Sequence, residues 1–242
     1  MKTSATIIAI ALTIAVVLST ALAQKSDKPW TDWNKKEVQK MLEDSPWAQT
    51  QTETDTSEMM YQPTGPAGSR SNDASRQAIG ATNQSINVKY FVRVFSARPI
   101  REALARGMML QQNLPATALD RLRQFAEVKS PDSIIFTVNY ESNDQRYGNA
   151  VMQAFASATT ASLKNTTYVQ RNDGKQLFIE EYVPPGKDGF GARFIFLRNI
   201  SDKAFFDANS GEIHFVAQFP RIPKIERRFK LGGMMYQGEL EF

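Results

Sequence analysis

The chain has 242 residues, with 29 Lys and Arg against 25 Asp and Glu, a formal net charge of +4, one histidine and no cysteine. The absence of thiols excludes disulfide bonds, cysteine nucleophiles and cysteine-ligated zinc, and a single histidine leaves any metal site to oxygen ligands, for which no calcium-loop spacing is present. Nucleic-acid-binding proteins carry a stronger and more clustered basic excess, so we expect no nucleic-acid partner, no metal and no cofactor.

Residues 1–23 have the three parts of a secretory signal peptide. Lys2 is the positive start, residues 7–18 are apolar, and Ala21-Leu22-Ala23 is a small-x-small cleavage site. The apolar run is shorter than the roughly 20 residues that span a bilayer comfortably. We therefore predict export to the periplasm or the extracellular medium, with no integral membrane span in the mature chain; an uncleaved membrane anchor is the alternative.

Residues 24–48 form a Trp-rich segment that contains all three tryptophans of the chain. Thr31 and Asp32 can accept hydrogen bonds from the N–H groups of a first helical turn. Pro46 disfavours the helical conformation of the residue before it, so we predict a helix from residue 30 to near Asp44. One half of that helix would be apolar: Trp30, Trp33, Val38, Met41 and Leu42.

The three tryptophans, Trp30, Trp33 and Trp47, have two interpretations. In the first, the segment docks on the main domain, and each ring removes about 150–250 Å² of surface from water. In the second, the rings form a recognition surface for a partner or for stacking against sugar rings. An apolar stripe at helical spacing usually faces a core, which favours docking. The three residues are nevertheless the candidate binding residues of the chain.

Residues 49–85 are rich in Gln, Thr, Ser, Gly, Asn and Pro and contain few large apolar side chains. Because little apolar surface is present to offset the entropy of ordering, we predict a polar flexible linker. A flexible chain of this length spans roughly 30–35 Å. The Trp-rich helix would therefore be tethered to the rest of the protein.

Residues 86–242 predict an α+β domain, with an antiparallel β-sheet and helices packed mainly on one face. Strand patterns recur at residues 86–96 and 133–141. We expect one helix from Pro99 to about residue 111 and another after Asn143 or Asp144. Residues 184–191 are expected to be a loop. Further antiparallel strands are expected at residues 167–171, 176–183, 192–198, 213–219, 226–231 and 236–242.

A further helix is expected after Pro115, where apolar residues recur at helical spacing. Leu119, Leu122, Phe125 and Ala126 would face the interior.

No reaction centre is evident among the titratable residues. His214 lies on the more polar face of its strand, beside Glu212, and an exposed strand histidine is favoured over a general base. Glu180 and Glu181 are adjacent on a strand and point to opposite faces. Glu239 and Glu241 share a face, which is typical of the solvent side of an edge strand. We therefore assign no catalytic residue.

Two short motifs are notable: W-x-x-W followed by S-P-W-A, and the closing LGGMMYQGELEF. Together they resemble a family of predicted exported proteins from soil bacteria of the acidobacterial type. The residues that carry the resemblance are Trp30, Trp33, Glu37, Ser45, Pro46, Trp47, Ala48, Met235, Tyr236, Gly238 and Glu239. The resemblance implies an exported bacterial protein and supplies no activity, ligand or catalytic residue.

Three functional hypotheses follow. The first is a non-catalytic exported protein, a binding or interaction module of the bacterial cell envelope whose partner is an unidentified envelope protein or polymer. The second is a carbohydrate-active hydrolase, which needs two carboxylates about 5–9 Å apart in a cleft. The third is a carrier of a small apolar ligand, which needs an apolar cavity between helices and sheet.

Overall fold

The structure, a computed structural model, describes residues 28–55, 85–111 and 114–242. The expected signal peptide, residues 1–23, and most of the expected linker lie outside these residues. The chain divides into two compact units, Met1–Asp32 and Trp33–Phe242. In the described part of the first unit, the 3-10 turn η1 (Trp30–Asp32) is closed by a 2.9 Å hydrogen bond from the Asp32 N–H to the Pro29 carbonyl.

The described residues of the second unit form two main antiparallel sheets and two small hairpins. The six-stranded sheet has the order β1 (Asp44–Ser45), β2 (Ala48–Asp55), β3 (Ile86–Val94), β4 (Ser133–Ser142), β8 (Ala192–Leu197) and β7 (Glu181–Val183). The four-stranded sheet has the order β12 (Ile225–Lys230), β11 (Glu212–Ala217), β5 (Thr167–Gln170) and β6 (Gln176–Phe178). The hairpins are β9 (Asn199–Ile200) with β10 (Lys203–Ala204), and β13 (Met235–Tyr236) with β14 (Glu239–Leu240).

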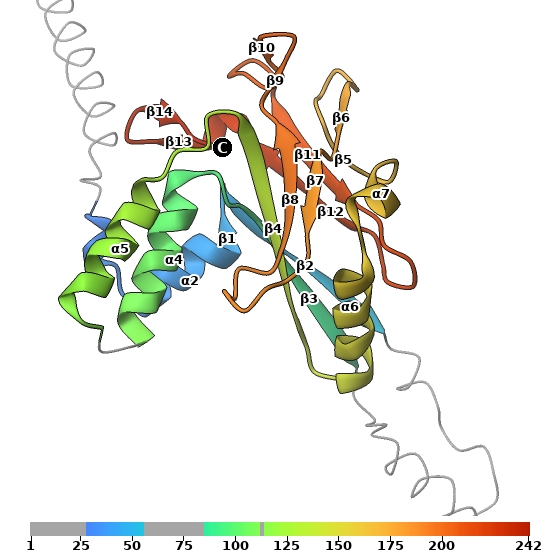
Figure 1. Ribbon diagram of the computed structural model, residues 1–242, viewed down its shortest axis with the longest axis horizontal. Coiled ribbons are helices and arrows are strands. Elements are labelled where there is room, and N and C mark those ends of the chain that lie inside the picture. The colour runs from blue at the N-terminus through green and yellow to red at the C-terminus, as the bar shows by residue number, and fades with distance from the viewer. Residues whose placement is uncertain (1–27, 56–84, 112–113) are drawn as a thin grey trace, which may run out of the picture. The chain divides into compact units, whose positions relative to one another are not determined.

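The helices lie on both sides of the six-stranded sheet (Figure 1). They are α2 (Lys35–Glu43), α4 (Arg98–Gln111), α5 (Ala116–Glu127), α6 (Gln145–Ser157), α7 (Thr160–Leu163) and the 3-10 turn η2 (Leu231–Gly233). In Figure 1, α2, α4 and α5 form one group, and α6 lies on the other side of the sheet with the four-stranded sheet. None of the described helices combines the length and the apolar character needed to cross a bilayer. The α+β class with antiparallel sheets is thus confirmed.

The one sheet expected for residues 86–242 is two sheets in the structure, because the chain changes sheet within residues 176–183. The Ile179 N–H donates to the Thr167 carbonyl at 3.1 Å and still belongs to the four-stranded sheet. The next N–H, of Glu180, donates to the Ile195 carbonyl at 2.8 Å in the six-stranded sheet. The predicted single strand is therefore two, β6 and β7. Alternation of side chains fixes the faces of a strand and cannot show which neighbour it pairs with.

The core between the two sheets consists largely of phenylalanine rings. Phe136 on β4 stacks on Phe215 on β11, with ring centroids 4.7 Å apart and an interplanar angle of 21°. Phe194 on β8 meets Phe215 edge to face at 5.2 Å, and Phe229 on β12 meets Phe136 at 5.6 Å. All four side chains are fully buried. The alternation of the strands places these rings on the facing sides of both sheets.

The start of the expected linker is a strand instead. Residues 48–55 form β2, which pairs with β3 over its whole length, from Ala48 opposite Arg93 to Asp55 opposite Ile86. Gln51 is buried and hydrogen-bonded across to the other sheet: its amide donates to the Lys224 carbonyl at 2.8 Å and accepts from the Glu226 N–H at 2.8 Å. Polar composition hid this strand, because buried polar side chains are tolerated when they are hydrogen-bonded.

The Trp-rich helix is shorter than predicted and is continuous with the sheet. Asn34, and neither Thr31 nor Asp32, is the N-cap of α2: its side chain accepts from the Glu37 N–H, while Glu37 accepts from the Asn34 N–H. This capping box starts the helix at Lys35, five residues later than expected. α2 ends at Glu43 and leads directly into β1 and β2, so no linker separates it from the sheet.

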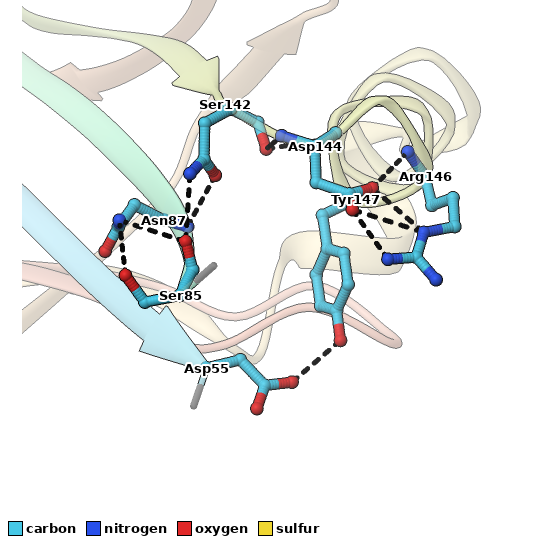
Figure 2. A network of polar contacts seen from close by, with 8 residues as sticks. Asp55, Ser85, Asn87, Ser142, Asp144, Arg146 and Tyr147 are labelled. Carbon is cyan, nitrogen blue, oxygen red and sulfur yellow. Dashed lines mark hydrogen bonds and ion pairs between the residues drawn. The ribbon is translucent and has the colours of Figure 1, made fainter. Parts of the chain in front are cut away.

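A polar network fixes the ends of β2 and β3 to the start of α6 (Figure 2). The Tyr147 hydroxyl donates to Asp55 at 2.7 Å. Asn143 accepts from the Asn87 N–H at 2.7 Å and donates to the Ser85 carbonyl at 2.9 Å. The N-cap of α6 is Asp144, one of the two residues expected there, and its pKa is lowered mainly by hydrogen bonding to Arg146. Asp55 and Ser85, the described residues on either side of residues 56–84, are therefore both held in place.

Candidate ligand-binding groove

The three candidate tryptophans lie on different elements. Trp30 belongs to the first unit, Trp33 directly precedes the N-cap of α2, and Trp47 lies in the turn between β1 and β2. Trp33 is 9% exposed and Trp47 is 5% exposed. The Trp47 indole N–H donates to the Glu241 carbonyl at 2.7 Å, and its ring meets Tyr236 edge to face at 5.9 Å. The burial of Trp33 and Trp47 favours the docking interpretation over a stacking surface.

His214 is less exposed than expected for a solvent-facing strand histidine. Its side chain is 14% exposed and lies 3.3 Å from the Glu226 carboxylate on β12. Burial, followed by the nearby Arg228, lowers the pKa of His214. Glu226 and Glu212 act in the opposite direction, and Glu226 is itself paired with Lys224 at 2.9 Å. The folded state therefore favours the neutral imidazole.

This arrangement predicts a loss of stability on mild acidification. Because the folded pKa of His214 lies below its ordinary value of 6.5, its contribution is present above pH 6.5 and is lost as pH falls through the folded pKa. We expect His214→Gln to lose less free energy of unfolding than the wild type between pH 7.5 and pH 5.5, as measured by urea titration. Equal losses in both proteins would contradict the assignment.

Three carboxylates line a cleft of about 400 Å³ beside the N-terminus of α4. Glu127, Glu239 and Glu241 line it together with four cations: Arg98, Arg101, Lys129 and Arg198. Glu239 is exposed on β14 of a two-stranded hairpin, as expected for the solvent side of an edge strand, and Glu241 is half-buried; both also line the cleft. The Arg98 backbone N–H donates to the Glu241 carboxylate at 3.0 Å. Glu180 and Glu181 are both exposed and do not line this cleft.

A buried acid below this cleft joins α4 to the C-terminal hairpin. Glu102 is fully buried, accepts from the Arg98 side chain at 2.8 Å, and also accepts from the Tyr236 hydroxyl. Burial raises its pKa, while its hydrogen bonds to Tyr236 and Arg98 act in the opposite direction. Arg101 is buried too and donates to the carbonyls of Phe95 and Ser96. These contacts stabilise the junction of α4, β3 and the hairpin.

A second concave site lies farther along α4 and is built around Phe190 in the β7–β8 loop, residues 184–191. The Phe190 N–H donates to Asp188 at 3.0 Å, and the Asn139 amide donates to the Gly189 carbonyl at 3.0 Å. Gly191 has a φ of +85°, and a Cβ there would clash with the Asn139 side chain and the Val138 carbonyl. Only glycine fits so close an approach, so the loop has a fixed conformation.

The fixed loop places Phe190 in a three-ring cluster. The Phe190 centroid is 5.2 Å from that of Phe95, which follows β3, and 5.5 Å from that of Phe125 on α5. The rings of Phe125 and Phe190 are nearly parallel, with an interplanar angle of 4°. Phe95 and Phe125 are 5.9 Å apart. The cluster joins α5 to the sheet through the loop.

A groove of about 410 Å³ lies beside this cluster, between α4, α5 and the β7–β8 loop. Its volume is within the range of small-ligand sites, roughly 300–1,000 Å³. Apart from one cation, its described lining is apolar: Met108, Leu114, Ala118, Arg121, Leu122, Phe125 and Phe190. The groove therefore offers surface that favours hydrocarbon over water.

The helix α5 leaves much of its apolar stripe uncovered by the described residues. Of the four residues predicted to face the interior, only Ala126 is buried, and Leu119, Leu122 and Phe125 are half-buried. The reason is position: α5 packs mainly on α4, outside the layer that contacts the sheet. In Figure 1, α5 is the outer member of the pair. This partial exposure, which periodicity alone could not predict, forms one wall of the groove.

One sequence feature, an aromatic residue in a glycine-rich loop, points to this site. Phe190 is the single aromatic residue in the loop PPGKDGFG, which is otherwise made of glycine, proline and charged residues. A large aromatic residue in such a loop is unusual enough to suggest a contact, but its partners, Phe95 and Phe125, are distant in sequence.

Comparisons of the chain with models of known protein families, with curated proteins and with solved structures find no match.

Proposed function

We propose that the protein is an exported, non-catalytic binding protein of the bacterial cell envelope that holds a small apolar ligand in the groove between α4 and α5. The observation that carries this proposal is the half-exposed apolar stripe of α5 beside Phe190, in a concavity of suitable volume. An amphipathic helix normally buries its apolar stripe, so surface of this kind in a concave site is typical of a ligand-binding function. Export rests on the signal-like residues 1–23.

The groove replaces the tryptophan segment as the contact surface in this proposal. Trp33 and Trp47 are almost wholly buried, so their rings are engaged in packing. The half-buried residues of the groove, in contrast, still expose apolar surface that a ligand would remove from water. Burial of such surface contributes about 25 cal/mol per Å².

A carbohydrate-active hydrolase is the second candidate, and the cleft lined by Glu127, Glu239 and Glu241 favours it. A glycosidase uses one acid whose pKa is raised by apolar surroundings. The acid with a raised pKa near this cleft is Glu102, which is fully buried and already hydrogen-bonded to Tyr236 and Arg98. Release of reducing ends from cell-wall polysaccharide, lost in Glu239→Gln, would support the hydrolase over the binding protein.

The binding proposal is tested with a neutral apolar probe, 1-octanol, added to ¹⁵N-labelled wild-type protein. We expect saturable shifts of amide resonances confined to α4, α5 and the β7–β8 loop. Leu122→Gln places an amide in the apolar wall and is expected to weaken binding about tenfold or more, since an unpaired polar group in an apolar site costs roughly 1–3 kcal/mol.

The matched control is Leu197→Gln, which makes the same change at an exposed apolar residue of β8 that does not line the groove. It should bind 1-octanol like the wild type. Thermal unfolding of each variant checks that the fold is intact, and Leu114→Gln serves as a second groove variant if Leu122→Gln unfolds. The proposed site would be refuted if 1-octanol caused no amide shifts in the wild type. It would also be refuted if the groove variants and Leu197→Gln bound 1-octanol equally well.

A further inference from the structure

One cation, Arg121, lines the apolar groove, and its guanidinium has no partner in the described part of the chain. Arg121 lines the groove, is exposed, and forms no ion pair or side-chain hydrogen bond with any described residue. Its neighbour Arg123, which does not line the groove, pairs with Asp120 at 3.1 Å. The two arginines of α5 therefore differ in both position and pairing.

The apolar lining and the single cation of the groove are complementary to an amphiphile with an anionic end. The lining offers hydrocarbon contact along α4, α5 and Phe190, and no described lining residue other than Arg121 is charged. A guanidinium presents paired N–H donors in a planar fork that matches a carboxylate bidentately. Because Arg121 is exposed, such a pair would be sensitive to salt.

We infer that the ligand of this groove is an alkyl chain with a terminal carboxylate, its chain against Leu122, Phe125 and Phe190 and its head group on Arg121. The inference rests on the proposed binding function and adds the chemical class of the ligand. A single cation matches a head group with one negative charge. A phosphate monoester, which carries close to two charges, would leave one of them without a partner in the described lining.

The test compares two probes of equal chain length, octanoate and 1-octanol, by isothermal titration calorimetry at low and high salt. Wild-type protein is expected to bind octanoate about tenfold more tightly than 1-octanol at low salt, a difference attributable to one charge-assisted contact. The preference should shrink at high salt, because exposed charges are screened. Affinity should rise about twofold to fourfold for each added methylene group from hexanoate to decanoate, until the groove is filled.

Two variants assign the head-group contact. Arg121→Gln should remove the preference for octanoate over 1-octanol that the wild-type protein shows. The matched control, Arg123→Gln, makes the same charge change two residues along the same helix and should keep the wild-type preference. Loss of the preference in both variants to the same extent would show a general effect of net charge and would overturn the assignment to Arg121.

The outcomes separate this inference from the proposed function. If both probes bind wild-type protein equally well, the binding function stands and the carboxylate specificity is wrong. If neither probe binds, both fail. A second copy of the chain is the competing occupant of an apolar groove. Sedimentation velocity showing a wild-type dimer that Leu122→Gln converts to a monomer would assign the groove to self-association and overturn the inference.

Discussion

Replacing Trp47 with alanine is expected to lower the free energy of unfolding by about 3–5 kcal/mol, the range for a large aromatic residue removed from a core. Trp47 is 5% exposed and packs edge to face on Tyr236. Its indole N–H donates to the Glu241 carbonyl, which lies 194 residues away in sequence. The alanine would therefore leave both a cavity and an unpaired carbonyl. Urea-induced unfolding followed by circular dichroism measures the loss.

The conservative variant Trp47→Phe separates packing from hydrogen bonding at this position. It keeps an aromatic ring against Tyr236 and removes the indole N–H, so we expect a loss of about 1–3 kcal/mol. Octanol binding should be the same in Trp47→Phe and in the wild type. A Trp47→Ala protein that unfolds like the wild type but no longer captures an envelope component would instead restore the recognition interpretation.

Phe136→Ala is the second substitution with a large expected effect, a loss of about 3–5 kcal/mol in the free energy of unfolding. The ring is fully buried between the two sheets. It stacks on Phe215 at 4.7 Å and contacts Phe229 at 5.6 Å. Removing it would open a cavity at the point where the sheets interdigitate, and close-packed aromatic neighbours fill such a cavity only in part.

The matched control for this change is Phe178→Ala on β6, where the side chain is 43% exposed. The same atoms are removed from a partly solvated site, so we expect a loss of no more than about 1 kcal/mol. Both variants are measured by urea titration at pH 7.5, above the range in which His214 titrates. Similar losses at the two positions would show that the sheets are not joined by the Phe136 cluster.

The local elements of the fold were largely predictable. The period-two pattern of residues 86–96 and the branched residues of 133–141 correspond to β3 and β4. The helix starting near Pro99 is α4, and the capping role of Asp144 is confirmed in α6. These predictions succeed because side-chain periodicity and capping are properties of neighbouring residues.

The pairing of β2 and the contacts that form the candidate site were not predictable from the same patterns. β2 was hidden because its buried Gln51 is satisfied by hydrogen bonds to Lys224 and Glu226, both on a remote part of the chain. The groove depends on α5 packing outside α4 and on Phe190 meeting Phe95 and Phe125. Contacts of this kind are set by tertiary packing, which local propensity does not encode.

The hydrogen bonds at the end of the β2–β3 pair where Asp55 lies opposite Ile86 also make that end suitable for inserting a foreign peptide. Asp55 and Ile86 are opposite each other in the antiparallel register, and Tyr147 and Asn143 hold Asp55 and Ser85 by hydrogen bonds. Lengthening a connection between two fixed ends costs only about 0.6 kcal/mol per doubling. A foreign epitope or a reporter peptide inserted there should consequently be displayed at a defined position by a domain that folds as before.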